Sequence, residues 1–159
     1  MKSIYIETTI PSFATARHSR DLIIAGHQAA TMQFWEKERH KYTLYVSQYV
    51  IDECADGDQE AAQRRLDFIK GITLIPDSDS IEELSIIYQN LLDIPERAKL
   101  DCCHLAVCVE AKMDYLLTWN CKHLGIQTFA KIKEYNTSKN LWTPLFVTPD
   151  DFLEVEEIE

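Results

Sequence analysis

Four polar side chains of the 159-residue chain stand where they do little for folding. They are Glu7, Glu53, Asp101 and Asn120. Glu7 closes an apolar run and Asn120 follows a strand-like run, whereas the other two acids interrupt helical runs. Because a buried carboxylate without a partner is costly, a divalent cation is the natural partner to propose. The pattern therefore indicates an acid pocket that holds a divalent metal ion.

The acids also have ordinary interpretations. Asp52 stands beside Glu53, and the phase of the surrounding helix allows either side chain to face inward. Asp101 lies among apolar residues, but an ion pair with Arg97, one turn earlier, would satisfy it, since i,i+4 pairs of this kind are common. His104, one turn after Asp101, is expected to be a hydrogen-bonded core histidine rather than a ligand.

Charge limits the kinds of partner. The formal net charge is −10, and residues 150–159 hold six acids and no base, which leaves 20 acids against 16 bases elsewhere. An acidic body argues against broad electrostatic binding of nucleic acid, although bound metal and a local basic patch could still hold a substrate. Two clusters could form such patches or be ordinary solvated charges: Arg17, His18 and Arg20, and Lys37, Arg39, His40 and Lys41.

Several other functional classes are disfavoured. The five cysteines are expected to be reduced core residues, and a zinc site from Cys103, His104, Cys121 and His123 lacks the paired spacing of such sites. With four glycines and no glycine-rich motif, the chain gives no support to a Rossmann-type nucleotide enzyme. No run reaches the roughly 18 apolar residues of a membrane helix, so we expect a soluble, cytoplasmic protein.

Short β-branched runs alternate with longer segments of helical period. Strands are predicted over 4–6, 43–46, 72–75, 115–117 and 145–147. Helices are predicted over 19–41, 48–55, 59–70, 80–92, 95–113 and 125–135, with a capping box formed by Asp93 and Glu96.

This alternation predicts an α/β fold. We expect a single three-layer domain over residues 1–149, with a central, mostly parallel five-stranded sheet flanked by helices, and an acidic C-terminal tail over 150–159. Ligands of open parallel sheets gather at the carboxyl ends of the strands, near the point where the winding reverses. The four polar residues lie in segments that can converge on that edge.

The motifs, taken in order, resemble the PIN-domain family of metal-dependent ribonucleases, in particular the VapC-like toxins of type II toxin–antitoxin pairs. The matching pieces are residues 4–12 (IYIETTIPS), 46–47 leading to Glu53 and 57–58, 100–106 (LDCCHLA) and 117–121 (LTWNC). The usual family pattern has Asp where this chain has Glu7 and Asn120. Both departures look like those of a subgroup with a Glu-Thr-Thr opening.

The resemblance implies a PIN-like fold and hydrolysis of RNA phosphodiester bonds with Mg²⁺ or Mn²⁺. The catalytic and metal-binding residues would be Glu7, Glu53, Asp101 and Asn120, the last as a neutral ligand or water positioner. Judged by their positions, Thr8, Thr9 and Thr118 either orient water or phosphate near the acids or are ordinary strand-end threonines, and Thr8 and Thr118 are predicted to contact substrate.

The implied partners are RNA, a cognate antitoxin protein and a second copy of the chain. Phe34 and Trp35 could lie on a dimer face, although packing in the core is the commoner fate of such residues. The alternative function is a catalytically inactive PIN-like binding module that acts through protein or RNA contacts.

Overall fold

A sheet of five parallel strands lies at the centre of the computed structural model, which describes residues 1–120 and 126–154. The strand order is β3-β2-β1-β4-β5. The strands are β1 (Ser3–Ile6), β2 (Thr43–Ser47), β3 (Thr73–Ile75), β4 (Tyr115–Leu117) and β5 (Leu145–Val147). Every neighbouring pair is parallel, so the predicted α/β class and five-stranded sheet are confirmed.

Strand β1 occupies the middle of the sheet. Ile4, Tyr5 and Ile6 are fully buried, as expected for an apolar strand covered on both faces. The chain runs from β1 outward to β2 and β3, then returns past β1 to β4 and β5. The winding therefore reverses between β1 and β4, where a ligand crevice forms in folds of this kind.

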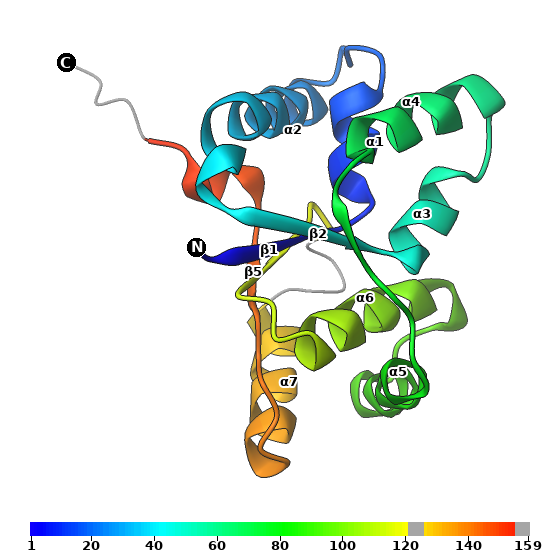
Figure 1. Cartoon of the computed structure of the whole chain (residues 1–159), viewed down its shortest axis with the longest axis vertical. Coiled ribbons are helices and arrows are strands. Elements are labelled where there is room, and N and C mark those ends of the chain that lie inside the picture. Colours follow the sequence, from blue (N-terminus) through cyan, green and yellow to red (C-terminus); the bar gives the residue numbers. More distant parts are fainter. Residues whose placement is uncertain (121–125, 155–159) are drawn as a thin grey trace.

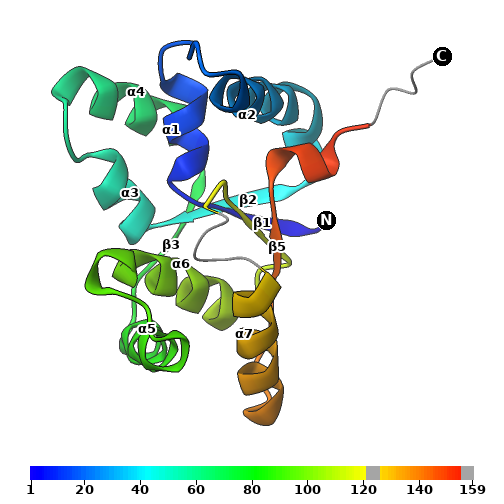
Figure 2. The same ribbon diagram turned by 180° about the vertical axis from the view of Figure 1, so that it is seen from behind.

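Helices cover both faces of the sheet and give three layers. They are α1 (Thr9–Thr15), α2 (Leu22–Gln33), α3 (Gln48–Cys54), α4 (Gln59–Ile69), α5 (Asp79–Leu92), α6 (Lys99–Glu110) and α7 (Ile126–Ser138). Figure 1 and the reverse view in Figure 2 show α1, α2 and α4 on one side and α5, α6 and α7 on the other. The described residues also form four short helical turns, which are η1 (Phe34–Glu38), η2 (Arg39–Lys41), η3 (Glu96–Ala98) and η4 (Pro149–Phe152).

Helix α1 was not predicted, because Pro11 and the flanking threonines have low helix propensity. Pro11 lies in the first turn, where its missing N–H needs no helical acceptor. The helix predicted over 19–41 is also shorter. It begins after Asp21, whose carboxylate accepts from the backbone of Ile23 and Ile24, and gives way to the π-helical turn η1 at Phe34.

The capping box predicted at Asp93 and Glu96 is wrong. Asp93 adopts a left-handed conformation, with φ of 50°, and ends α5. Pro95 precedes the 3-10 turn η3 and makes no side-chain cap, so α6 starts only at Lys99. The left-handed Asp93 closes one helix instead of opening the next.

The aromatic residues considered for a dimer face pack inside the fold. Phe34 is fully buried, and its ring centroid lies 5.3 Å from that of Phe152. Trp35 packs on Phe68, with ring centroids 4.2 Å apart. The core interpretation of Phe34 is therefore confirmed, whereas Trp35 is half-buried and the dimer stays a prediction. Phe152 belongs to η4, so this part of the expected acidic tail packs against the domain.

The cysteines behave as small core residues. Cys54, Cys102 and Cys108 are buried and free, as expected, whereas the free Cys103 is only half-buried and Cys121 lies outside the described residues. Among the described helices, none is long and apolar enough to cross a membrane.

Candidate functional site

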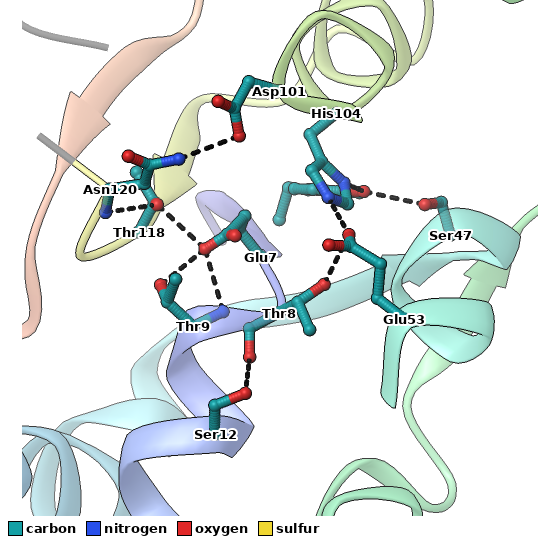
Figure 3. Close-up of polar contacts among 11 residues, drawn as sticks. Glu7, Thr8, Thr9, Ser12, Ser47, Glu53, Asp101, His104, Thr118 and Asn120 are labelled. Atoms are coloured by element: carbon teal, nitrogen blue, oxygen red, sulfur yellow. Dashed lines mark hydrogen bonds and ion pairs between the residues drawn. The ribbon is translucent and has the colours of Figure 1, made fainter. Parts of the chain in front are cut away.

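The four predicted site residues lie at the carboxyl edge of the sheet. Glu7 follows β1 and Asn120 comes soon after β4, on the two strands that flank the reversal of winding. Glu53 lies near the end of α3, which follows β2 directly, and Asp101 lies in the first turn of α6. Figure 3 shows Asp101 and Asn120 on one side of Glu7 and Glu53 on the other.

Glu7 is buried, with 3% of its surface exposed. Its Oε2 accepts hydrogen bonds from the Thr9 backbone N–H at 2.9 Å, the Thr9 hydroxyl at 2.5 Å and the Thr118 hydroxyl at 2.8 Å. Burial raises the pKa of Glu7 above its ordinary value, although the charge of His104 and the threonine hydrogen bonds oppose the rise. No described residue donates a hydrogen bond to Oε1, which is left for another partner.

Glu53 faces inward, whereas the neighbouring Asp52 is exposed and accepts from the side chain of Gln48 at 2.8 Å. Oε1 of Glu53 contacts Nε2 of His104 at 2.5 Å and accepts from the Thr8 hydroxyl at 2.8 Å. Burial acts to raise the pKa of Glu53, but the hydrogen bond and charge of His104 and the bond from Thr8 outweigh it and lower the pKa. As in Glu7, one carboxylate oxygen is engaged, and no described residue donates to the other.

Asp101 and Asn120 contact each other directly. The Asn120 amide donates from Nδ2 to Oδ1 of Asp101 at 2.8 Å, and its backbone N–H donates to the Thr118 hydroxyl at 2.9 Å. Thr118 thus joins Glu7 to the Asp101–Asn120 pair. The first turn of α6 suits a carboxylate, because the helix dipole is positive there. The ion pair considered with Arg97 involves a side chain outside the described residues.

His104 lies among the three carboxylates, and sequence reasoning did not foresee this role. It is 1% exposed and contacts Glu53 through Nε2 and the Tyr5 hydroxyl through Nδ1, the latter at 2.6 Å. The Tyr5 hydroxyl lies in turn 2.7 Å from the hydroxyl of Ser47. The expectation of a hydrogen-bonded core histidine is confirmed.

The charge of His104 depends on those acids. Burial acts to lower the pKa of His104, but the hydrogen bond to Glu53 and the charges of Glu7, Glu53 and Asp101 outweigh it, so the pKa is raised. As an imidazolium, His104 balances part of the negative charge of the site. Its position one turn after Asp101 was the available signal, but the pairing with Glu53 spans 51 positions of sequence.

Threonines hold the carboxylates in place. Thr8 precedes α1 and supports Glu53, and Thr118 supports Glu7. Thr9, which was considered with Thr8 and Thr118 as a residue near the acids, donates two hydrogen bonds to Glu7 and accepts from the Trp119 backbone N–H at 2.8 Å. The Glu-Thr-Thr segment therefore builds both halves of the site.

The oxygen atoms of these side chains are of the kind that a hard divalent cation prefers, but the side chains do not surround a single point. Carboxylate and amide oxygens are what Mg²⁺ and Mn²⁺ prefer, and Glu7 and Glu53 each keep one oxygen without a donor from the described residues. Within residues 1–120 and 126–154, however, no three His, Cys, Asp or Glu side chains stand close enough to hold an ion as they are. The zinc site considered above includes Cys121 and His123, which lie outside those ranges.

A pocket of about 420 Å³ opens beside Glu53. Tyr49 and Leu100 give it an apolar wall, and Asp52, Glu53 and Asp56 give it an acidic one. Because phosphate is repelled by such acids, this pocket favours a positively charged group.

Comparison with known proteins places the fold. No protein-family model matches the chain, and no curated protein matches its sequence. The structure is similar to VapBC2 from Rickettsia felis, solved bound to a DNA fragment from its promoter, with a TM-score of 0.59 and 15% identity over 92% of this chain and 98% of that one.

Two further structures are similar. VapC20 of Mycobacterium tuberculosis, a sarcin-ricin loop cleaving toxin, gives a TM-score of 0.59 and 12% identity over 76% of this chain and 92% of that one. FitAB bound to an IR36 DNA fragment gives a TM-score of 0.60 and 12% identity over 97% of this chain and 99% of that one. The PIN-like fold expected from the sequence is thereby confirmed.

Proposed function

We propose that the protein is a divalent-metal-dependent ribonuclease and the toxin of a toxin–antitoxin pair. The observation that carries this proposal is the placement of Glu7, Glu53 and Asp101, from three separate segments, at the carboxyl edge of the sheet where its winding reverses. The fold likeness supports it, since VapC20 is a toxin that cleaves the sarcin-ricin loop.

The metal would be held by Glu7, Glu53 and Asp101, directly or through water, with Asn120 as a neutral ligand or water positioner. When bound, Mg²⁺ or Mn²⁺ lowers the pKa of a coordinated water and offsets charge on the phosphoryl oxygens. Thr8 and Thr118 orient the two glutamates through their hydroxyls. A carboxylate of the site that is not fully engaged by the metal would accept the proton of the attacking water.

The partners would be RNA, a cognate antitoxin and a second copy of the chain. VapBC2 and FitAB were solved bound to DNA, the former to a fragment of its promoter. The acidic pocket beside Glu53 suits a Lys or Arg side chain of an antitoxin. Leu22 and Ile23, which are 88% and 72% exposed at the start of α2, provide apolar surface for a protein partner.

A second candidate function is an inactive binding module of the same fold. It is favoured by the internal pairing of the site, in which His104, threonines and Asn120 already engage the acids. Calorimetric titration discriminates between the two. Heat on adding millimolar Mn²⁺ to the wild type, absent with Glu7→Gln, supports the nuclease, whereas no heat in either supports the module.

The direct test is cleavage of an end-labelled RNA that contains single-stranded and looped regions. We expect wild-type protein to cut it in Mg²⁺ or Mn²⁺ and to stop in EDTA, and Glu7→Gln purified in parallel to be inactive. Equal cutting by both proteins, or cutting that persists in EDTA, would contradict a metal-dependent site at Glu7.

A further inference from the structure

A second pocket lies at the opposite end of the sheet from the acids. It has a volume of about 410 Å³ and is lined at the amino ends of two strands, by Thr43 and Leu44 of β2 and by Thr73 of β3. Because all strands are parallel, this end faces away from the edge that carries Glu7 and Asn120. The two pockets therefore cannot share one small ligand.

The charge of this pocket is opposite to that of the protein. Its lining includes Arg39, His40 and Lys70 and no Asp or Glu, although the chain has a net charge of −10. The nearby Lys41 is held by Glu38 at 2.7 Å and does not line the pocket. Among the described residues, neither Arg39 nor Lys70 has a carboxylate partner. This pocket is therefore a local basic surface on a protein that is acidic overall.

The two permanent cations are positioned by different elements. The Arg39 guanidinium lies 4.6 Å from the ring centroid of Trp35, whose ring is itself packed on Phe68. Stacking on an aromatic face orients the planar guanidinium and leaves its edge for hydrogen bonds. Lys70 ends α4, and Gly71, with φ of 85°, turns the chain into β3. Both cations are thereby directed to one pocket by the fold.

We propose that this pocket, the Arg39–Lys70 pocket, binds a phosphate group. A guanidinium supplies paired donors to phosphate oxygens, an ammonium adds a point charge, and the lining threonines carry hydroxyl donors. The phosphate could belong to a free ion or nucleotide or to the backbone of a single-stranded RNA. The proposal needs no metal and is independent of catalysis at the acid site.

The test compares two double variants with the same change of charge. Arg39→Gln/Lys70→Gln alters the pocket, and Arg64→Gln/Lys133→Gln removes two exposed cations that do not line it. Binding of a fluorescent single-stranded RNA twelve-mer and of inorganic phosphate is measured in EDTA, which prevents metal-dependent cleavage. Lys70→Gln alone, at an exposed position, serves if the change beside Trp35 impairs folding.

We expect wild type and the control variant to bind RNA alike and the pocket variant to bind at least about tenfold more weakly. The slope of log affinity against log salt should fall by about 0.7, since the pocket binds one phosphate and each phosphate contact of a single strand contributes about 0.7. Inorganic phosphate bound by wild type and not by the pocket variant, without RNA binding, would assign the pocket to a small phosphate. Equal behaviour of the two double variants, or no binding of either probe, would overturn the proposal.

Discussion

His104 explains how three acids can share a partly buried site before any cation binds. Its Nε2 contacts Glu53, and the charges of Glu7 and Asp101 also act on its pKa. Without such a cation the acids would repel one another, which raises the free energy of the folded state. When protonated, His104 therefore lowers the repulsion between the carboxylates.

Replacing Asp101 should change ribonuclease activity much more than it changes the stability of the fold. We expect Asp101→Asn to lower ribonuclease activity by at least about 100-fold, since even the partners of metal ligands contribute about 10- to 100-fold. Stability should change by less than about 1 kcal/mol or rise, because the new amide oxygen can still accept from Asn120 and repulsion between the acids falls.

The matched control is Asp52→Asn, at an exposed carboxylate one position before Glu53. It should retain activity in the same assay and unfold at the wild-type temperature. A large loss of thermal stability in Asp101→Asn would instead favour a structural ion pair at that position.

The titration of His104 should be visible in stability against pH. Folding raises the pKa of His104, so its contribution to stability is complete below the unfolded value of about 6.5 and is lost as pH rises through the folded value. Thermal melts of wild type in EDTA should show Tm falling as pH rises above about 6.5. In His104→Gln we expect a lower Tm throughout and a flatter dependence over that window. Parallel curves for the two proteins would contradict the charged state of His104.

The bounds of the strands could be predicted from the sequence, whereas one helix could not. The strands were placed within about one residue because β-branched runs have few alternatives. Helix α1 was missed because Thr9, Pro11 and Ser12 are poor signals of a helix that tertiary packing and Ser12–Thr8 bonding stabilise.

The site could be predicted only as a set of candidates. Sequence could not decide between Asp52 and Glu53, because a seven-residue helix gives little phase information. The contact between His104 and Glu53 and the hydrogen bond from Asn120 to Asp101 join separate elements, and no local sequence pattern predicts them. The metal and substrate roles stay predictions.

Two glycines provide opposite tests of the elements that contain them. Gly26 lies inside α2 and an added Cβ would meet nothing within 4 Å, so Gly26→Ala should stabilise the protein by about 0.5–1 kcal/mol. Gly71 has open space too, but its φ of 85° disfavours a side chain, so Gly71→Ala should destabilise by about 1–2 kcal/mol. Urea unfolding measures both, and effects of the same sign would contradict the described backbone.

For the whole molecule, the sheet separates two charged sites by its polarity. Acids gather at the carboxyl ends of the strands, and the Arg39–Lys70 pocket lies at their amino ends. The proposed cation site and the proposed anion site therefore lie at opposite ends of the sheet. Binding at either site should stabilise the entire fold, because ligands that bind only the folded state shift the unfolding equilibrium.

Metal addition should therefore raise the melting temperature. At 100 times its dissociation constant, Mn²⁺ should stabilise wild type by about 2.7 kcal/mol. Asp52→Asn should respond in the same way and Asp101→Asn far less, as measured by differential scanning calorimetry with and without EDTA. An equal shift in Asp101→Asn would place the ion elsewhere.

Glu7, Glu53 and Asp101 are proposed to hold one cation between them. An anomalous difference map from crystals soaked in Mn²⁺ tests this best, because it locates the ion and its ligands together. We expect a peak bounded by oxygens of these three carboxylates, with Glu53 turned toward it. A map whose strong peaks all lie away from Glu7 would contradict a shared cation site.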